Sequence, residues 1–163
     1  MKYLGVVFLG VFLFLVACKP AEVEPPSVFE QLDIDTELID IWLAENEIID
    51  VLIEEDSKIR YTINEVGPGM GISPRFQEGD TVWVDYEGRI LETGEIFDSA
   101  TDADLALDRT IPGWQIMLPF MTEGDVFTIY LQSFFGYGAD GNGSSIPPNT
   151  VIVFDIKLNK VTN

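Results

Sequence analysis

The sequence predicts an α+β domain in which an antiparallel β-sheet packs against one short helix. Three observations favour this class. Apolar and polar residues alternate with the period of two that is typical of strands, Gly-rich turns separate these segments, and only one short stretch between them has helical character. A second, amphipathic helix is predicted before the sheet. At 163 residues the chain can bury one sizeable core, so we expect a single folded domain with an N-terminal extension.

The N-terminus has the pattern of a secretory signal. Lys2 supplies a positive charge, and residues 3–17 form an apolar run that is short for a membrane span. The run ends in Leu-Val-Ala-Cys, which resembles the bacterial lipobox and implies that Cys18 receives lipid. The alternative is an ordinary signal cleaved near Ala17 that leaves a free thiol. We expect residues 1–17 to be a signal peptide and Cys18 to be a membrane anchor.

A tether and a helix are predicted between the signal and the sheet. Residues 18–32 combine proline and acidic side chains with few large apolar ones, which favours an extended, solvated chain. From residue 33 to about 46, four apolar residues recur at helical spacing and define one face: Ile34, Leu38, Ile41 and Trp42. We assign residues 33–57 to a helical extension that docks on the downstream domain, with dimerisation through the helix as the alternative. Residues 47–57 themselves give no clear pattern.

The region from residue 58 to 163 is predicted to form the domain itself. Strands are expected at about residues 58–63, 80–86, 95–98, 125–132 and 151–158. Gly-rich turns at 67–71 and 79–80 separate the first two strands, and the 92–94 turn reverses the second. The helix is predicted at 112–118, because Pro112 suits a first helical turn and Pro119 ends it. The Val-Ile-Val-Phe run at 151–154 indicates a strand that is buried on both faces.

Composition excludes several classes of function. The net charge of −19 repels polyanions, so nucleic acid is not an expected partner. The chain has no histidine and one cysteine, which rules out imidazole or thiolate metal sites and Ser-His-Asp or Cys-His catalysis. No nucleotide-binding glycine motif is present, and neither acidic segment, 102–108 or 140–144, completes a calcium-binding EF-hand loop. We expect no metal and no cofactor.

Five segments, in order, resemble the FKBP family of peptidyl-prolyl cis/trans isomerases. They are GDTVWVDYEG at 79–88, GEIFDS at 94–99, IPGW at 111–114, FGYGA at 135–139 and IPPNTVIVFDI at 146–156. The resemblance covers about residues 58–161 and implies a strongly twisted sheet wrapped around the short helix. The segment before Ile111 is about two residues shorter than the family pattern. A position that is often a bulky aromatic in the family therefore falls near Ala103.

The resemblance also implies a set of site residues. The floor of an apolar proline pocket would be Trp114, and its walls would be Tyr86, Phe97, Ile146 and Phe154. Three polar groups would orient the peptide during catalysis: the side chains of Asp98 and Tyr137 and the backbone N–H of Ile111. Without the order of the motifs, these aromatics would be read as ordinary core residues, and Asp98 as the cap of a turn.

Isomerisation of an X-Pro bond suits this residue set, because rotation breaks no covalent bond and needs no nucleophile. We expect an isomerase that assists the folding of exported envelope proteins from the periplasmic or outer-membrane face. Its partners would be proline-containing segments, the membrane through its lipid anchor, and macrolide inhibitors of the FKBP family. The alternative is a catalytically weak chaperone or adaptor module in an envelope or motility assembly.

Overall fold

The computed structural model of the chain describes residues 25–68 and 80–162. The predicted signal peptide, Cys18, most of the tether and most of the 67–71 turn lie outside the described residues. Within the two described ranges, no helix combines the length and the apolar character that crossing a membrane requires.

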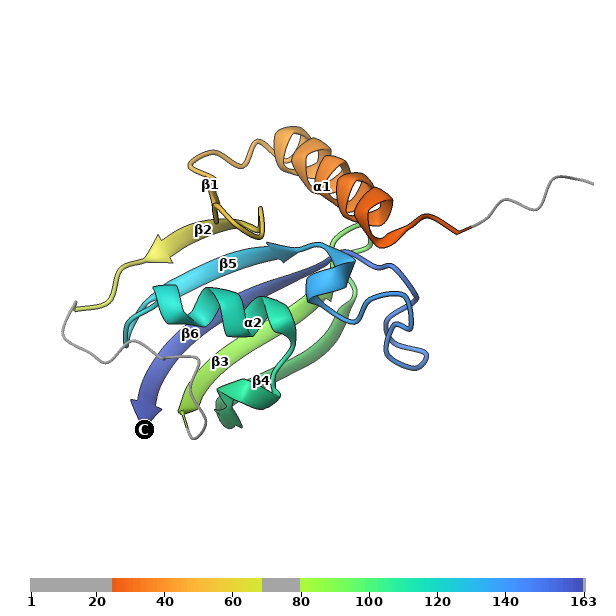
Figure 1. The fold of residues 1–163 in the computed structure, drawn as a ribbon. Coiled ribbons are helices and arrows are strands. Elements are labelled where there is room, and N and C mark those ends of the chain that lie inside the picture. Colours follow the sequence, from red (N-terminus) through yellow and green to blue (C-terminus); the bar gives the residue numbers. More distant parts are fainter. Residues whose placement is uncertain (1–24, 69–79, 163) are drawn as a thin grey trace, which may run out of the picture.

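Six antiparallel strands form one sheet in the order β1-β2-β5-β6-β3-β4 (Figure 1). Their bounds are β1 Leu52–Ile53, β2 Arg60–Glu65, β3 Thr81–Ile90, β4 Ile96–Ala106, β5 Val126–Leu131 and β6 Ile152–Thr162. The last strand lies in the centre and pairs with both β5 and β3. The sheet is therefore complete only once β6 has paired with both β5 and β3.

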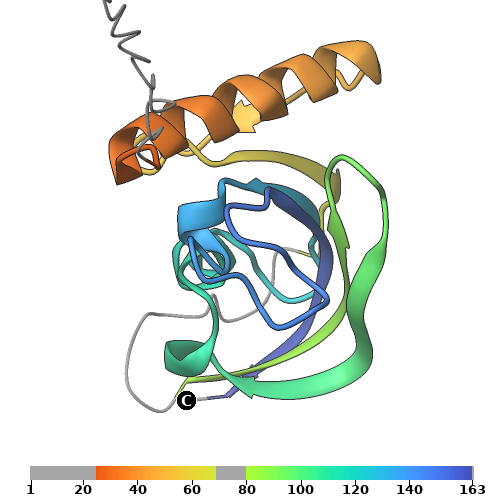
Figure 2. The ribbon, with the colours of Figure 1, turned by 90° about the vertical axis from the view of Figure 1, so that its right-hand side faces the viewer.

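One short helix, α2 (Pro112–Met117), packs on the concave face of the sheet, and Figure 2 shows the strands curving around it. Three single-turn helices accompany it: η1 Leu107–Arg109, η2 Leu118–Phe120 and η3 Ser133–Phe135. The main core lies between α2 and the sheet, where Met117, Ile129 and Ile156 are fully buried. The predicted fold class is confirmed.

Strand β4 is much longer than the predicted 95–98. Its alternation is interrupted by a bulge, where Ala103 pairs with Val84 but Ala100 pairs with Tyr86. Asp102, at the bulge, has a positive φ of 52°, and its N–H donates to Asp85 Oδ1 at 2.8 Å. Because the bulge inserts a residue and the inward side chains are small, the sequence does not show the strict alternation of a strand here.

Helix α1 (Val28–Glu45) begins before the predicted start at residue 33, so residues 28–32, predicted as tether, are helical, and it ends close to the predicted end at about residue 46. Ser27 caps it: Ser27 Oγ accepts from the Glu30 N–H at 3.3 Å, and Glu30 Oε2 accepts from the Ser27 N–H at 2.8 Å. After the helix the backbone turns at Glu47, with a φ of 54°, and then adds the short strand β1. Capping at Ser27 and the positive φ at Glu47 set the two ends of the helix.

The prediction that this helix docks on the domain is confirmed, although its docked face was only partly predicted. Ile39 and Leu43 are buried against the convex face of the sheet, with Trp42 partly buried beside them. Ile34 and Ile41, predicted on the same face, are 51% and 49% exposed. The docked face is rotated around the helix axis relative to the predicted one, because it includes the buried carboxylate of Asp35. A pattern of apolar residues alone does not predict a charged residue on a buried face.

The Val-Ile-Val-Phe run of β6 is buried on both faces, as predicted. Ile152 and Phe154 point into the main core with α2, whereas Val151 and Val153 lie under α1 with Tyr130. A sheet with one solvated face would alternate here. The apolar run is thus explained by a helix on each side of the sheet.

Candidate active site

A cavity of about 290 Å³ opens between α2, the β4-α2 connection and the concave face of the sheet. Nine residues line it: Tyr86, Asp98, Leu105, Arg109, Thr110, Ile111, Trp114, Tyr137 and Phe154. They come from β3, β4, η1, the connection from η1 to α2, α2 itself, the segment after η3, and β6. Residues far apart in the sequence therefore meet at this one place.

Trp114 forms the floor because α2 lies very close to β5. A Cβ at Gly113 would come within 2.6 Å of the Leu131 side chain, so only glycine permits this approach. The indole is 3% exposed, and its buried Nε1 has no hydrogen-bond acceptor among the described residues. The ring thus offers the cavity an apolar surface rather than a hydrogen bond.

The walls are aromatic rings packed edge to face on this floor. The ring centroids of Tyr86 and Phe154 lie 5.1 and 5.2 Å from that of Trp114, with interplanar angles of 84° and 82°. Phe97 packs behind Phe154 at 5.5 Å and reaches Tyr137 at 6.2 Å. The five rings form one continuous aromatic cluster that holds the shape of the cavity.

Asp98 and the two tyrosines give the rim its polar character. Tyr86 donates its hydroxyl proton to Asp98 Oδ2 at 2.8 Å. Burial, and then the hydrogen bond and charge of Asp98, raise the pKa of Tyr86 to about 12. Burial and the charge of Asp98 also raise the pKa of Tyr137, which a hydrogen bond with Asn142 partly offsets. Both phenols are therefore protonated at neutral pH and act as donors.

The backbone at the start of α2 adds a further donor. Ile111 is the N-cap residue, with φ −64° and ψ 152°, and its carbonyl accepts from the Trp114 N–H at 3.0 Å. Its own N–H donates to no other described residue, which is expected at a helix N-terminus. Because Ile111 lines the cavity, this N–H can donate to a ligand carbonyl.

The family model of FKBP-type peptidyl-prolyl cis-trans isomerases matches residues 73–159, more than half of the chain. The chain belongs to the FKBP family. The family resemblance of the sequence is thereby confirmed.

Among FKBP relatives, a probable FKBP-type isomerase, FkpA, of Neisseria meningitidis is 34% identical over 124 residues, which are 74% of this chain and 44% of the relative. FK506-binding protein 1 of Saccharomyces cerevisiae is 33% identical over 61% of this chain and 90% of its own length. This FKBP chain thus spans less than half of the bacterial relative and nearly all of the yeast one.

Two solved structures have a similar fold. The peptidyl-prolyl isomerase of Pseudomonas syringae superposes with a TM-score of 0.67 at 28% identity, covering 87% of this chain and all of that one. FkpA of Escherichia coli gives a TM-score of 0.65 at 26% identity, covering 81% of this chain and 63% of that one. Helix α1 lies outside residues 73–159, which the family model matches.

Most of the predicted FKBP site residues meet at the cavity, but two do not line it. Those that do are Tyr86, Asp98, Ile111, Trp114, Tyr137 and Phe154. Phe97 lies behind Phe154, and Ile146 is 1% exposed within the main core. These two side chains support the walls from behind.

Three lining residues were missed: Leu105, Arg109 and Thr110. The bulky position expected near Ala103 is filled by Leu105, two residues further along β4. Both side chains are partly buried, and only leucine is large enough to form a wall. No local pattern identifies Leu105, because the bulge at Asp102 interrupts the alternation along β4. Among the described residues of this FKBP chain, no group of three or more Cys, Asp or Glu is arranged to hold a metal ion.

Proposed function

We propose that the chain is a peptidyl-prolyl cis/trans isomerase whose catalytic domain spans residues 58–163. The observation that carries the proposal is the aromatic cavity floored by Trp114, with the donors of Ile111 and Tyr137 at its rim. Family membership supports the same activity, since the FKBP relatives carry isomerase names. The activity is a proposal because the chain spans less than half the length of the bacterial relative that carries the isomerase name.

The chemistry needs only a change of environment around the amide. Rotation about the bond has a barrier of about 18–20 kcal/mol because it disrupts amide resonance. The planar amide is the more polar form, so a dry aromatic cavity stabilises it less than water does. Each reduction of about 1.4 kcal/mol in the barrier gives a tenfold faster reaction. No nucleophile, metal or cofactor is required.

The proposed roles follow from position. Trp114, Tyr86 and Phe154 hold the proline ring, while the Ile111 N–H and Tyr137 O–H donate to peptide carbonyls. Asp98 fixes the hydroxyl of Tyr86 and so holds that wall in place. Phe97 and Ile146 support the walls without touching the substrate. At about 290 Å³ the cavity suits a proline ring, with flanking residues outside it.

A kinetic assay on proline peptides tests the activity. The purified chain should accelerate cis/trans exchange, followed by NMR, and Tyr137→Phe should lower kcat/KM about three- to tenfold by removing one donor. Tyr61→Phe is the matched control, because Tyr61 stacks on Phe127 outside the cavity. Asp98→Ala should also weaken turnover without unfolding, with the exposed Asp104→Ala as its control.

A folded chain that exchanges the peptide no faster than buffer would refute the isomerase. Binding of unfolded polypeptides regardless of proline would then identify the chaperone or adaptor module. If Tyr137→Phe or Asp98→Ala unfolds the chain, that side chain has a structural role instead.

Macrolides are proposed inhibitors because the yeast relative is named for binding FK506. A change in tryptophan emission on adding such a compound, lost when Trp114 alone of the three tryptophans is replaced by phenylalanine, would report binding in this cavity.

The proposed location is extracytoplasmic and membrane-anchored, at the periplasmic or outer-membrane face, where exported proteins would be the substrates. Support comes from the apolar N-terminal run that ends in Leu-Val-Ala-Cys at Cys18. Incorporation of labelled fatty acid into the chain, lost in Cys18→Ala, would test the anchor. Label that persists in the variant, or is absent from the unaltered chain, would exclude lipidation at Cys18.

A further inference from the structure

Helix α1 makes a buried polar contact with the segment that carries Tyr137 into the cavity. Asp35, near the middle of α1, is 1% exposed. Its Oδ2 accepts from both the N–H and the hydroxyl of Ser133, at 2.8 and 2.6 Å. Its Oδ1 accepts from Gln31 Nε2 at 2.7 Å. The carboxylate therefore has partners on both oxygens and is fixed in its position.

Ser133 passes this constraint on to the residues around Tyr137. The carbonyl of Ser133 accepts from the Gly136 N–H at 2.9 Å and from the Gly138 N–H at 2.8 Å. These two amides flank Tyr137 on either side, and Gly138 has a φ of 61° that completes the turn. Glycine gives this segment little rigidity of its own. The Ser133 carbonyl therefore holds one side of this turn, while the Asn149 N–H donates to the Gly138 carbonyl at 2.9 Å, and Asp35 holds Ser133 itself.

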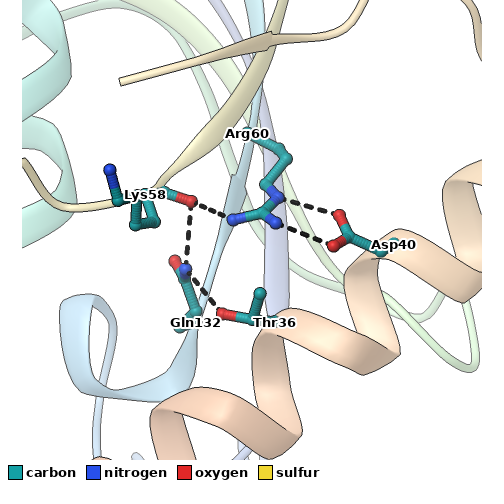
Figure 3. A network of polar contacts seen from close by, with 5 residues as sticks. All are labelled: Thr36, Asp40, Lys58, Arg60 and Gln132. Atoms are coloured by element: carbon teal, nitrogen blue, oxygen red, sulfur yellow. Dashed lines mark hydrogen bonds and ion pairs between the residues drawn. The ribbon is translucent and has the colours of Figure 1, made fainter. Parts of the chain in front are cut away.

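A second network fixes the middle of the helix to the sheet (Figure 3). Gln132 Nε2 lies 3.2 Å from both Thr36 Oγ1 and the Lys58 carbonyl. Arg60 makes a two-pronged contact with Asp40, at 2.8 and 2.7 Å. These contacts hold α1 against β2 and β5, but only the contact with Asp35 reaches the residue whose carbonyl holds the Tyr137 turn. Asp40 thus provides a matched comparison on the same helix.

We propose that Asp35 is a positioning residue for the proline cavity, which fixes through Ser133 the turn that presents Tyr137. This proposal rests on the proposed function, in which the Tyr137 hydroxyl orients the peptide. A helix outside the isomerase domain thereby contributes to turnover although it does not line the cavity. Without the carboxylate, the Ser133 N–H and hydroxyl are buried without an acceptor, and the turn relaxes to find new partners.

The kinetic test compares two substitutions on α1 in the full chain. Asp35→Ala should lower kcat/KM by about as much as Tyr137→Phe or less, about three- to tenfold, because displacing a catalytic group by a fraction of an ångström weakens its contribution to the transition state. Asp40→Ala removes a comparable docking contact and should change kcat/KM by less than about twofold. Asp35→Asn keeps an acceptor for Ser133 and should recover most of the activity. Equal losses in Asp35→Ala and Asp40→Ala would overturn the proposal.

A double-mutant cycle asks whether Asp35 acts through Tyr137. In a Tyr137→Phe background, Asp35→Ala should cost little further activity, since the hydroxyl it positions is already absent. Fully additive losses would show that the carboxylate supports the domain in some other way.

Amide exchange separates this proposal from the proposed function. The Gly136 and Gly138 N–H groups should exchange slowly in the unaltered chain and in Asp40→Ala, and faster in Asp35→Ala. This measurement does not depend on activity, so a chain without isomerase activity would refute the proposed function alone. Unchanged exchange in a folded Asp35→Ala variant would overturn the positioning role.

Discussion

Gly88 on β3 is a position where two rings of the aromatic cluster pack directly against the backbone. It pairs with Asp98 on one side and with Phe154 on the other. A Cβ built at Gly88 would lie 2.5 Å from Phe154 Cε1 and 2.7 Å from Phe97 Cζ. Atoms in ordinary contact are at least 3.4 Å apart, so the Phe154 ring would have to move by about 0.9 Å.

Gly88→Ala should therefore affect both stability and turnover. Overpacking of this kind costs about 1–3 kcal/mol, whereas restricting the unfolded chain by alanine returns about 0.4–1 kcal/mol. We expect a net loss of about 1–2 kcal/mol, or roughly 3–6 °C in Tm. Because Phe154 also contacts Trp114 and lines the cavity, its displacement should lower kcat/KM about tenfold or more.

Thermal unfolding and the peptide exchange assay, run on the same samples, measure both effects. Glu87→Ala is the control on the neighbouring residue, whose side chain lies beside Arg89 and not in the cavity. A Gly88→Ala variant with unchanged Tm and unchanged kcat/KM would show that the Phe97 and Phe154 rings accommodate a Cβ without being displaced. Close packing of Phe154 and Phe97 around Gly88 would then not determine the shape of this wall.

Three further predictions concern charge. The pKa of Tyr86 is raised to about 12 and that of Tyr137 is raised above 10, so kcat/KM should stay flat from about pH 6 to 9. The stability that these protonated phenols contribute should be lost only as pH rises from about 10 through 12. An inflection of kcat/KM near pH 7 would contradict this. Arg109 is the one cation among the described residues lining the cavity, so a Glu-Pro peptide should show a KM about two- to fivefold below that of Lys-Pro, and Arg109→Gln should abolish the difference. Asp40→Ala leaves the 10% exposed Arg60 side chain without its carboxylate partner. The free energy of unfolding measured in urea should fall by about 1–2 kcal/mol. An unchanged urea midpoint would mean that water replaces the ion pair at no cost.

Local signals in the sequence were sufficient for much of the fold. Pro112 and Pro119 bracket α2 because proline is tolerated in a first turn and cannot continue a helix, and the helix ends at Met117 as these rules require. The apolar run of β6 predicted burial on both faces, and the structure supplies a helix for each face. The Ser27 and Glu30 pair was also a readable signal for the start of α1, which the apolar periodicity alone placed too late.

The remaining features depend on contacts that no local pattern contains. The bulge at Asp102 is stabilised by Asp85 across the strand pair, so alternation along β4 fails to show its full length. Asp35 is buried because Ser133, 98 residues away, supplies its hydrogen bonds. Leu105 lines the cavity only because the bulge sets its direction. These residues are determined by pairing and burial rather than by periodicity.

The position of α1 over the sheet has a consequence for the order in which the chain folds. Ile39 and Leu43 are synthesised early, yet they pack against Val151 and Val153, which are near the end of the chain. Contacts of such long sequence separation form late and slow the search for the native state. A growing polypeptide that has not reached residue 151 leaves the apolar side of this helix uncovered. Until β6 is made and pairs, this exposed apolar surface therefore favours self-association of the incomplete chain.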